Sequence, residues 1–96
     1  MPITLTPRER AALKARAHPL EAVVRVGNAG LTDAVVAEAD RALTAHELIK
    51  VRLGAGRDER TLLAEGLSAR TDAAIVQNVG KVLVLWRPRP VEGQPT

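Results

Sequence analysis

The side chains that could carry catalysis are few and unfavourably spaced. The 96 residues include two histidines and no cysteine, which excludes a thiolate nucleophile, a disulfide and a Cys-ligated metal. Neither His18 nor His46 belongs to a spacing typical of a metal site or a catalytic triad. Glu38 and Asp40 stand two positions apart in a helical pattern, so their carboxylates face different directions. The sequence therefore predicts a protein that is not an enzyme and that binds no metal or cofactor.

Two glycine-rich loops each follow a predicted strand. The stretch 54–61 lacks the Lys-Ser/Thr ending of a nucleotide phosphate loop and carries acids where a triphosphate would lie, so we interpret it as a turn. Gly27-Asn28-Ala29-Gly30 is more informative, because a G-x-x-G loop before a helix lets the backbone approach a sugar–phosphate chain. Its amides and the helix dipole favour anions. If either glycine has a positive φ, substituting it would also strain the fold.

Basic side chains are concentrated in separate blocks of the sequence. The net charge is only +3, although the pI is about 10.2. Residues 49–57 carry Lys50, Arg52 and Arg57 without an acid, whereas residues 21–48 carry five acids and two bases. If folding brings the basic blocks together, they form a patch able to neutralise phosphates. Otherwise they are ordinary solvated surface.

The local patterns predict three helices and four strands. Thr6, Pro7 and Glu9 give the first helix a cap, a favoured first residue and a capping box, and His18 before a proline ends it near residue 17. The other elements are strands over 22–26, 48–53, 74–79 and 82–87, a helix over 33–45 capped by Thr32, and a helix that Asp58 caps and that runs through Arg70, with Leu62, Leu63 and Leu67 turned inward.

This order of elements predicts an α/β fold, a two-layer sandwich in the order α-β-α-β-α-β-β with a mixed four-stranded sheet. Within residues 48–53, Ile49, Val51 and Leu53 alternate with Lys50 and Arg52, which indicates one dry face and one basic, wet face. The chain length fits one small domain. We expect that domain over residues 1–88, followed by a proline-rich flexible tail over residues 89–96.

Four blocks of the sequence carry a resemblance to a known family. Residues 17–20, 26–32, 46–51 and 79–88 resemble, in order and spacing, the bacterial YhbY proteins, which are single CRM domains. The resemblance covers roughly residues 4–90. It implies a fold similar to the C-terminal domain of translation initiation factor 3. It also implies that the chain binds ribosomal RNA in precursors of the large ribosomal subunit, without catalysis.

The predicted RNA-binding site combines the loop with a basic surface. Its residues are Gly27, Asn28, Ala29 and Gly30, together with Arg8, Arg10, Lys14, Arg16, Arg25, Lys50, Arg52, Lys81 and Arg87. Many family members have a lysine inside the loop, so Asn28 and Ala29 make this loop electrically weaker. Trp86 stands where the family usually has tyrosine, which keeps a flat ring but changes the hydrogen-bonding group.

Two other function classes remain open from the sequence. The basic patch could dock an acidic partner protein, and the glycine loops could belong to a small nucleotide enzyme. No apolar run approaches the roughly 20 residues that span a bilayer, and the N-terminus lacks the pattern of a secretory signal. We therefore expect a cytoplasmic protein without a membrane anchor. We also expect a monomer without a small-molecule substrate.

Overall fold

A computed structural model describes residues 4–54 and 56–88, so the predicted tail lies outside the described residues. Its helices are α1 (Pro7–Ala17), α2 (Asp33–His46) and α3 (Arg57–Thr71), and its strands are β1 (Ala22–Val26), β2 (Leu48–Leu53), β3 (Ala74–Val79) and β4 (Val82–Trp86). The sheet order is β1-β2-β4-β3. Strands β1 and β2 are parallel, and the other two pairs are antiparallel. The predicted α/β fold with a mixed four-stranded sheet is confirmed.

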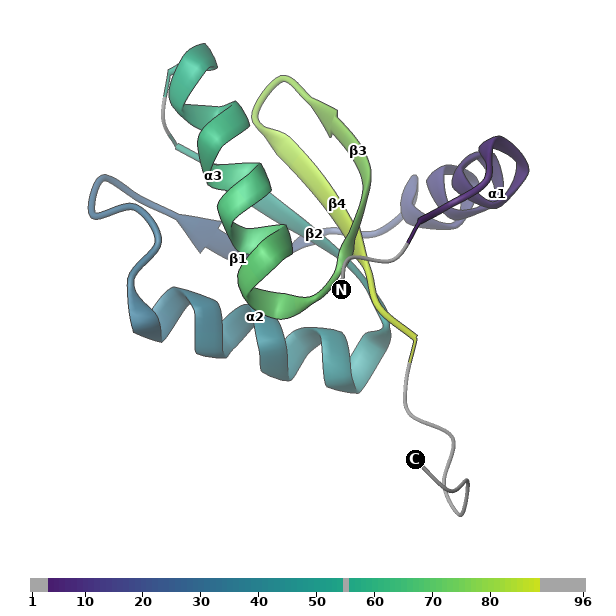
Figure 1. Ribbon diagram of the computed structural model, residues 1–96, viewed down its shortest axis with the longest axis horizontal. Coiled ribbons are helices and arrows are strands. Elements are labelled where there is room, and N and C mark those ends of the chain that lie inside the picture. Colours follow the sequence, from purple (N-terminus) through teal and green to yellow (C-terminus); the bar gives the residue numbers. More distant parts are fainter. Residues whose placement is uncertain (1–3, 55, 89–96) are drawn as a thin grey trace.

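One face of the sheet packs against α2 and α3 and forms the main core. The fully buried side chains there include Val24 and Val26 of β1, Ile49, Val51 and Leu53 of β2, Leu83 and Leu85 of β4, Ala39 and Leu43 of α2, and Ala64 and Leu67 of α3. In Figure 1, α2 runs along the bottom of the view and α3 crosses the strands on the left. These two helices and the sheet are the two layers of the sandwich.

Helix α1 covers part of the opposite face of the sheet. Leu13 and Ala17 pack against Leu48, Val76 and Val84 in a second, smaller cluster. Figure 1 shows α1 at the right, apart from the other two helices. Because α1 lies over β2, β3 and β4, the same face of β1 is left open, and that opening determines where a ligand can approach.

Two local predictions about α3 are wrong. The N-cap of the helix is Gly56, two residues before the predicted cap Asp58, and it makes no side-chain capping bond, so Asp58 lies inside the first turn. Leu62 is 69% exposed instead of buried. The buried stripe of α3 follows Ala64, Leu67 and Thr71, whose three- and four-residue spacing turns Leu62 away from the sheet.

Helix α1 carries a pH-sensitive cap. The Thr6 amide donates to Glu9 Oε1 at 3.0 Å, and the Glu9 amide donates to Thr6 Oγ1 at 3.1 Å. The bond from the Thr6 backbone and, secondarily, the bond with the Thr6 side chain lower the pKa of Glu9 below 4.5. A lowered folded-state pKa gives stability that is present above the unfolded value and is lost as the pH falls through the folded value.

We therefore expect wild-type protein to lose more thermal stability than Glu9→Gln between pH 7 and pH 3. The glutamine can keep the capping geometry, but it does not titrate. The measurement is the melting temperature of both proteins at several pH values. Parallel curves would show that the Glu9 carboxylate has no part in the acid sensitivity of the fold.

Candidate nucleic-acid interface

Three cations lie on the open face of the sheet. Along β2, Lys50 and Arg52 alternate with core residues and so point to the α1 side. Arg25 of β1 alternates with Val24 and Val26 in the same way and is the register partner of Arg52. We call Arg25, Lys50 and Arg52 the basic sheet face. None of the four strands contains an Asp or a Glu, so no carboxylate within the sheet neutralises these charges.

Helix α1 adds one cation to the border of the basic sheet face. Lys50 Nζ donates to the carbonyl oxygen of His18 at 3.1 Å, which fixes the Lys50 side chain beside the end of α1. Lys14 and Lys50 line a shallow depression of about 240 Å³ together with Gln77. The depression therefore brings a helix cation and a strand cation next to hydrogen-bonding groups.

The predicted G-x-x-G loop is a tight turn directly after β1. The Gly30 amide donates to the Gly27 carbonyl oxygen at 3.0 Å, and Gly30 has φ +73°. Gly27 lies outside the left-handed region, and a Cβ added there would meet no atom within 4 Å. The two glycines therefore have different roles: Gly30 is required by the backbone conformation, whereas Gly27 leaves open space outside the chain.

The exit of the loop is fixed to α3. A Cβ at Gly66 would lie 2.8 Å from Leu31 Cδ1, so the absence of a side chain at Gly66 makes room for Leu31. Arg70 donates to the Leu31 carbonyl oxygen at 3.2 Å and to Asp33 Oδ1 at 2.8 Å. Thr32 caps α2 by accepting from the Val35 amide, as expected. Gly66 and Arg70 are not among the predicted site residues, because only the tertiary packing of α3 reveals their role.

Two of the predicted RNA-contacting arginines are half-buried and bonded to other parts of the fold. Arg10 Nη1 donates to the carbonyl oxygens of Ile75 and Val76, at 2.6 and 3.2 Å, and so ties α1 to β3. The Arg87 guanidinium lies at the other side of the sheet, where it bonds groups of α2 and α3. The structure therefore does not bring these two guanidinium groups into the basic sheet face.

The remaining predicted cations are dispersed over exposed positions. At about 100° per residue, Lys14 and Arg16 lie on opposite flanks of α1, and Arg8 lies on its outer side. Lys81 is exposed in the turn between β3 and β4, and its carbonyl oxygen accepts from the Leu53 amide at 2.8 Å. Of these four, Lys14 borders the basic sheet face, and Lys81 lies at the end of β2 near the loop.

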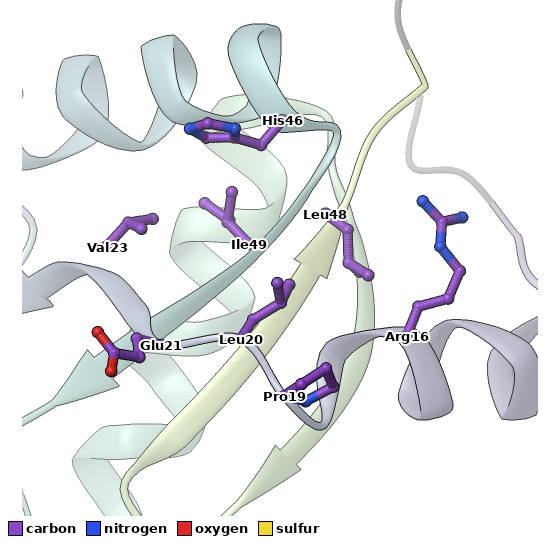
Figure 2. A pocket seen from close by; sticks show the side chains of 8 residues that line it. All are labelled: Arg16, Pro19, Leu20, Glu21, Val23, His46, Leu48 and Ile49. Atoms are coloured by element: carbon purple, nitrogen blue, oxygen red, sulfur yellow. The ribbon is translucent and has the colours of Figure 1, made fainter.

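A separate groove of about 630 Å³ lies beside the start of β1 (Figure 2). Its lining residues are Arg16, Pro19, Leu20, Glu21, Val23, His46, Leu48 and Ile49. This lining offers no hydroxyl or thiol nucleophile and only one carboxylate, so it lacks the paired groups of a hydrolytic site. Across residues 4–54 and 56–88, no three His, Asp or Glu side chains are grouped so that they could share a metal ion.

Trp86 is half-buried and packs against the smaller core cluster under α1. Its ring therefore covers the edge of that cluster.

Within the described ranges, no helix has both the length and the apolar character needed to cross a membrane.

These features define a class of protein: a small α/β domain that presents a glycine turn beside a cationic sheet face. The CRS1 / YhbY (CRM) domain family matches residues 5–87, and the chain belongs to that family. The predicted family membership is confirmed.

The chain is similar over most of its length to two proteins named as RNA-binding proteins and to one solved structure. The chain is 45% identical over 86 residues to an RNA-binding protein of Haemophilus influenzae, and the match covers 88% of this chain and 87% of that protein. It is 40% identical to a protein of Pseudomonas aeruginosa named as a probable RNA-binding protein, with 92% and 86% of the two chains covered. The solution structure of a Staphylococcus aureus protein, described as a candidate RNA-binding protein, matches with a TM-score of 0.81 at 29% identity over 93% of this chain and 94% of that one.

Proposed function

We propose that this chain binds RNA through the basic sheet face and the Gly27–Gly30 turn. The observation that carries the proposal is the pairing of Arg25 with Arg52 on neighbouring strands. Lys50, two residues before Arg52 in β2, lies on the same face. Like charges at neighbouring sheet positions are unfavourable for folding. A polyanion that lies across both strands would neutralise this repulsion, and the names of the relatives support RNA as that polyanion.

The mechanism of recognition follows from the kinds of side chain present. Arginine and lysine bind phosphates, and the open space at Gly27 lets a sugar–phosphate backbone approach the turn. The basic sheet face itself contains no aromatic ring on which a base could stack, and Trp86, the one aromatic residue of the sequence, is half-buried against the smaller core cluster. We therefore propose recognition of the RNA backbone and shape, and no catalysis.

The salt dependence of RNA affinity tests this mechanism. For single strands the logarithm of the binding constant falls by about 0.7 per phosphate contact for each tenfold rise in salt. We expect a slope of about −2 or steeper from the three cations of the basic sheet face. The measurement is affinity for a ribosomal RNA fragment at several salt concentrations. A flat response would overturn the electrostatic mechanism.

The proposed RNA is ribosomal RNA in precursors of the large ribosomal subunit, bound by a cytoplasmic monomer during assembly. The likeness to the YhbY proteins supports this finer assignment. Crosslinking the protein to RNA in cells and mapping the sites tests it directly. Crosslinks spread over messenger and transfer RNA, without enrichment in large-subunit RNA, would still support RNA binding. They would contradict the assignment to ribosomal RNA.

An acidic protein docked on the same cations is the second candidate. Sedimentation of native lysate distinguishes the two. An RNA-bound chain is expected to migrate with large ribosomal precursors and to leave them after ribonuclease treatment. Migration that survives ribonuclease would favour a protein partner.

Substitutions at the two loop glycines are expected to separate binding from folding. Gly27→Ala should leave the melting temperature nearly unchanged, because its Cβ meets open space, and should weaken RNA binding about two- to tenfold by displacing a backbone contact. Gly30→Ala should lower stability by about 1–2 kcal/mol, because of its positive φ. Thermal melts and RNA titrations check both. Equal melting temperatures for the two variants would contradict the distinction drawn from their backbone angles.

A further inference from the structure

A second basic depression lies on the other side of the sheet, between α3 and the turn that joins β3 to β4. It has a volume of about 270 Å³, and its lining residues are Arg57, Arg60, Thr61, Asn78 and Gly80. Two guanidinium groups, a hydroxyl and an amide make this lining rich in hydrogen-bond donors. Asp58 and Glu59 belong to the same helical turn but are not among the lining residues. The depression therefore has the chemistry of a phosphate site.

The end of β2 connects the Gly27–Gly30 turn with the β3–β4 turn that borders the depression. The Gly54 amide donates to the Val26 carbonyl oxygen at 2.9 Å, and a Cβ at Gly54 would lie 3.9 Å from Gly27 Cα. The Leu53 amide donates to the Lys81 carbonyl oxygen at 2.8 Å, and Lys81 follows Gly80 of the depression. The glycine turn, the end of β2 and the β3–β4 turn thus form one continuous edge.

We infer that the depression lined by Arg57 and Arg60 is a second phosphate site for the same RNA. The RNA chain reaches this site where it crosses the edge of the sheet. The inference rests on the proposed RNA-binding function. Lys81, which is exposed and whose carbonyl oxygen bonds to the end of β2, follows Gly80 of the depression in the chain and adds a further cation to this edge. The RNA then contacts both sides of the sheet end, instead of the α1 side alone.

The test compares Arg57→Gln with Arg41→Gln, which removes the same charge from an exposed position on α2. At about 0.1 M salt, a lost single-strand phosphate contact corresponds to about fivefold weaker binding, and the salt slope falls by about 0.7. We expect this change for Arg57→Gln and about twice the slope change for Arg57→Gln/Arg60→Gln. Arg41→Gln should bind as wild type does. Melting temperatures verify that each variant is folded.

The probes are a polyuridylate oligonucleotide, a ribosomal RNA fragment and a free nucleoside monophosphate. If wild-type protein binds neither RNA, the proposed function itself fails. If wild type binds RNA and the Arg57 variants match the Arg41 control, only the second site is overturned. Tight, Arg57-dependent binding of the monophosphate without competition from RNA would also overturn the inference, because the depression would then be an independent nucleotide site.

Discussion

Replacing Arg25, Lys50 and Arg52 together by glutamine is expected to weaken RNA binding about 100-fold at about 0.1 M salt. Three lost single-strand phosphate contacts correspond to a decrease of about 2 in the salt slope, and hence to about two decades of affinity at that concentration. Because Arg25 and Arg52 are register partners of like charge, their removal should not lower the melting temperature. Fluorescence titrations at several salt concentrations, with thermal melts, measure both quantities.

Single substitutions provide the matched control for this experiment. Arg52→Gln and Arg41→Gln each remove one exposed arginine, but only Arg52 belongs to the basic sheet face. A nonspecific effect of net charge would weaken binding equally in both variants. Equal losses, or near wild-type affinity in a folded triple variant, would show that RNA approaches the molecule elsewhere.

The second large effect is expected for stability at Arg87. Its guanidinium donates to Asp40 Oδ1 at 2.6 Å, to the Thr71 and Asp40 carbonyl oxygens at 2.8 and 3.0 Å, and to Thr44 Oγ1 at 2.9 Å. The Arg87 side chain is only 20% exposed. Arg87→Met removes all these donors and leaves the acceptor on buried Thr71 unsatisfied, which costs about 2–3 kcal/mol. The melting temperature should fall by roughly 10–20 °C.

Arg87→Lys distinguishes this structural role from an RNA contact. An ammonium group keeps the charge but cannot span the acceptors that the planar guanidinium reaches. We expect Arg87→Lys to destabilise the protein nearly as much as Arg87→Met. Because lysine keeps the positive charge, the RNA affinity of the folded protein should stay within about twofold of wild type. A lysine variant with wild-type stability would contradict the assignment of Arg87 to the fold.

Most of the fold can be predicted from local signals in the sequence. The capping box at Thr6 and Glu9, the Thr32 cap and the alternation over residues 48–53 each act within a few residues, and each appears in the structure. The burial predicted for Leu62 is wrong, because two adjacent leucines do not reveal which of them faces the sheet. Ala64, a small residue with a weak signal, determines the buried phase of α3.

The candidate site is less predictable, because contacts between residues far apart in the sequence decide which of its cations stay exposed. Arg10 reaches carbonyl oxygens 65 and 66 positions away, and Arg87 reaches α2 across 47 positions. In the sequence these two arginines cannot be distinguished from Arg25 or Arg52, which remain exposed. The strand pattern does predict that Lys50 and Arg52 share one face, but only the position of α1 decides how much of that face stays open.

The contact between Gly66 and Leu31 ties the packing of α3 to the placement of the Gly27–Gly30 turn. Any side chain added at position 66 would displace Leu31, the residue that directly follows Gly30. A graded series of substitutions at position 66 is therefore expected to shift the exit of the Gly27–Gly30 turn without changing any residue of the turn itself.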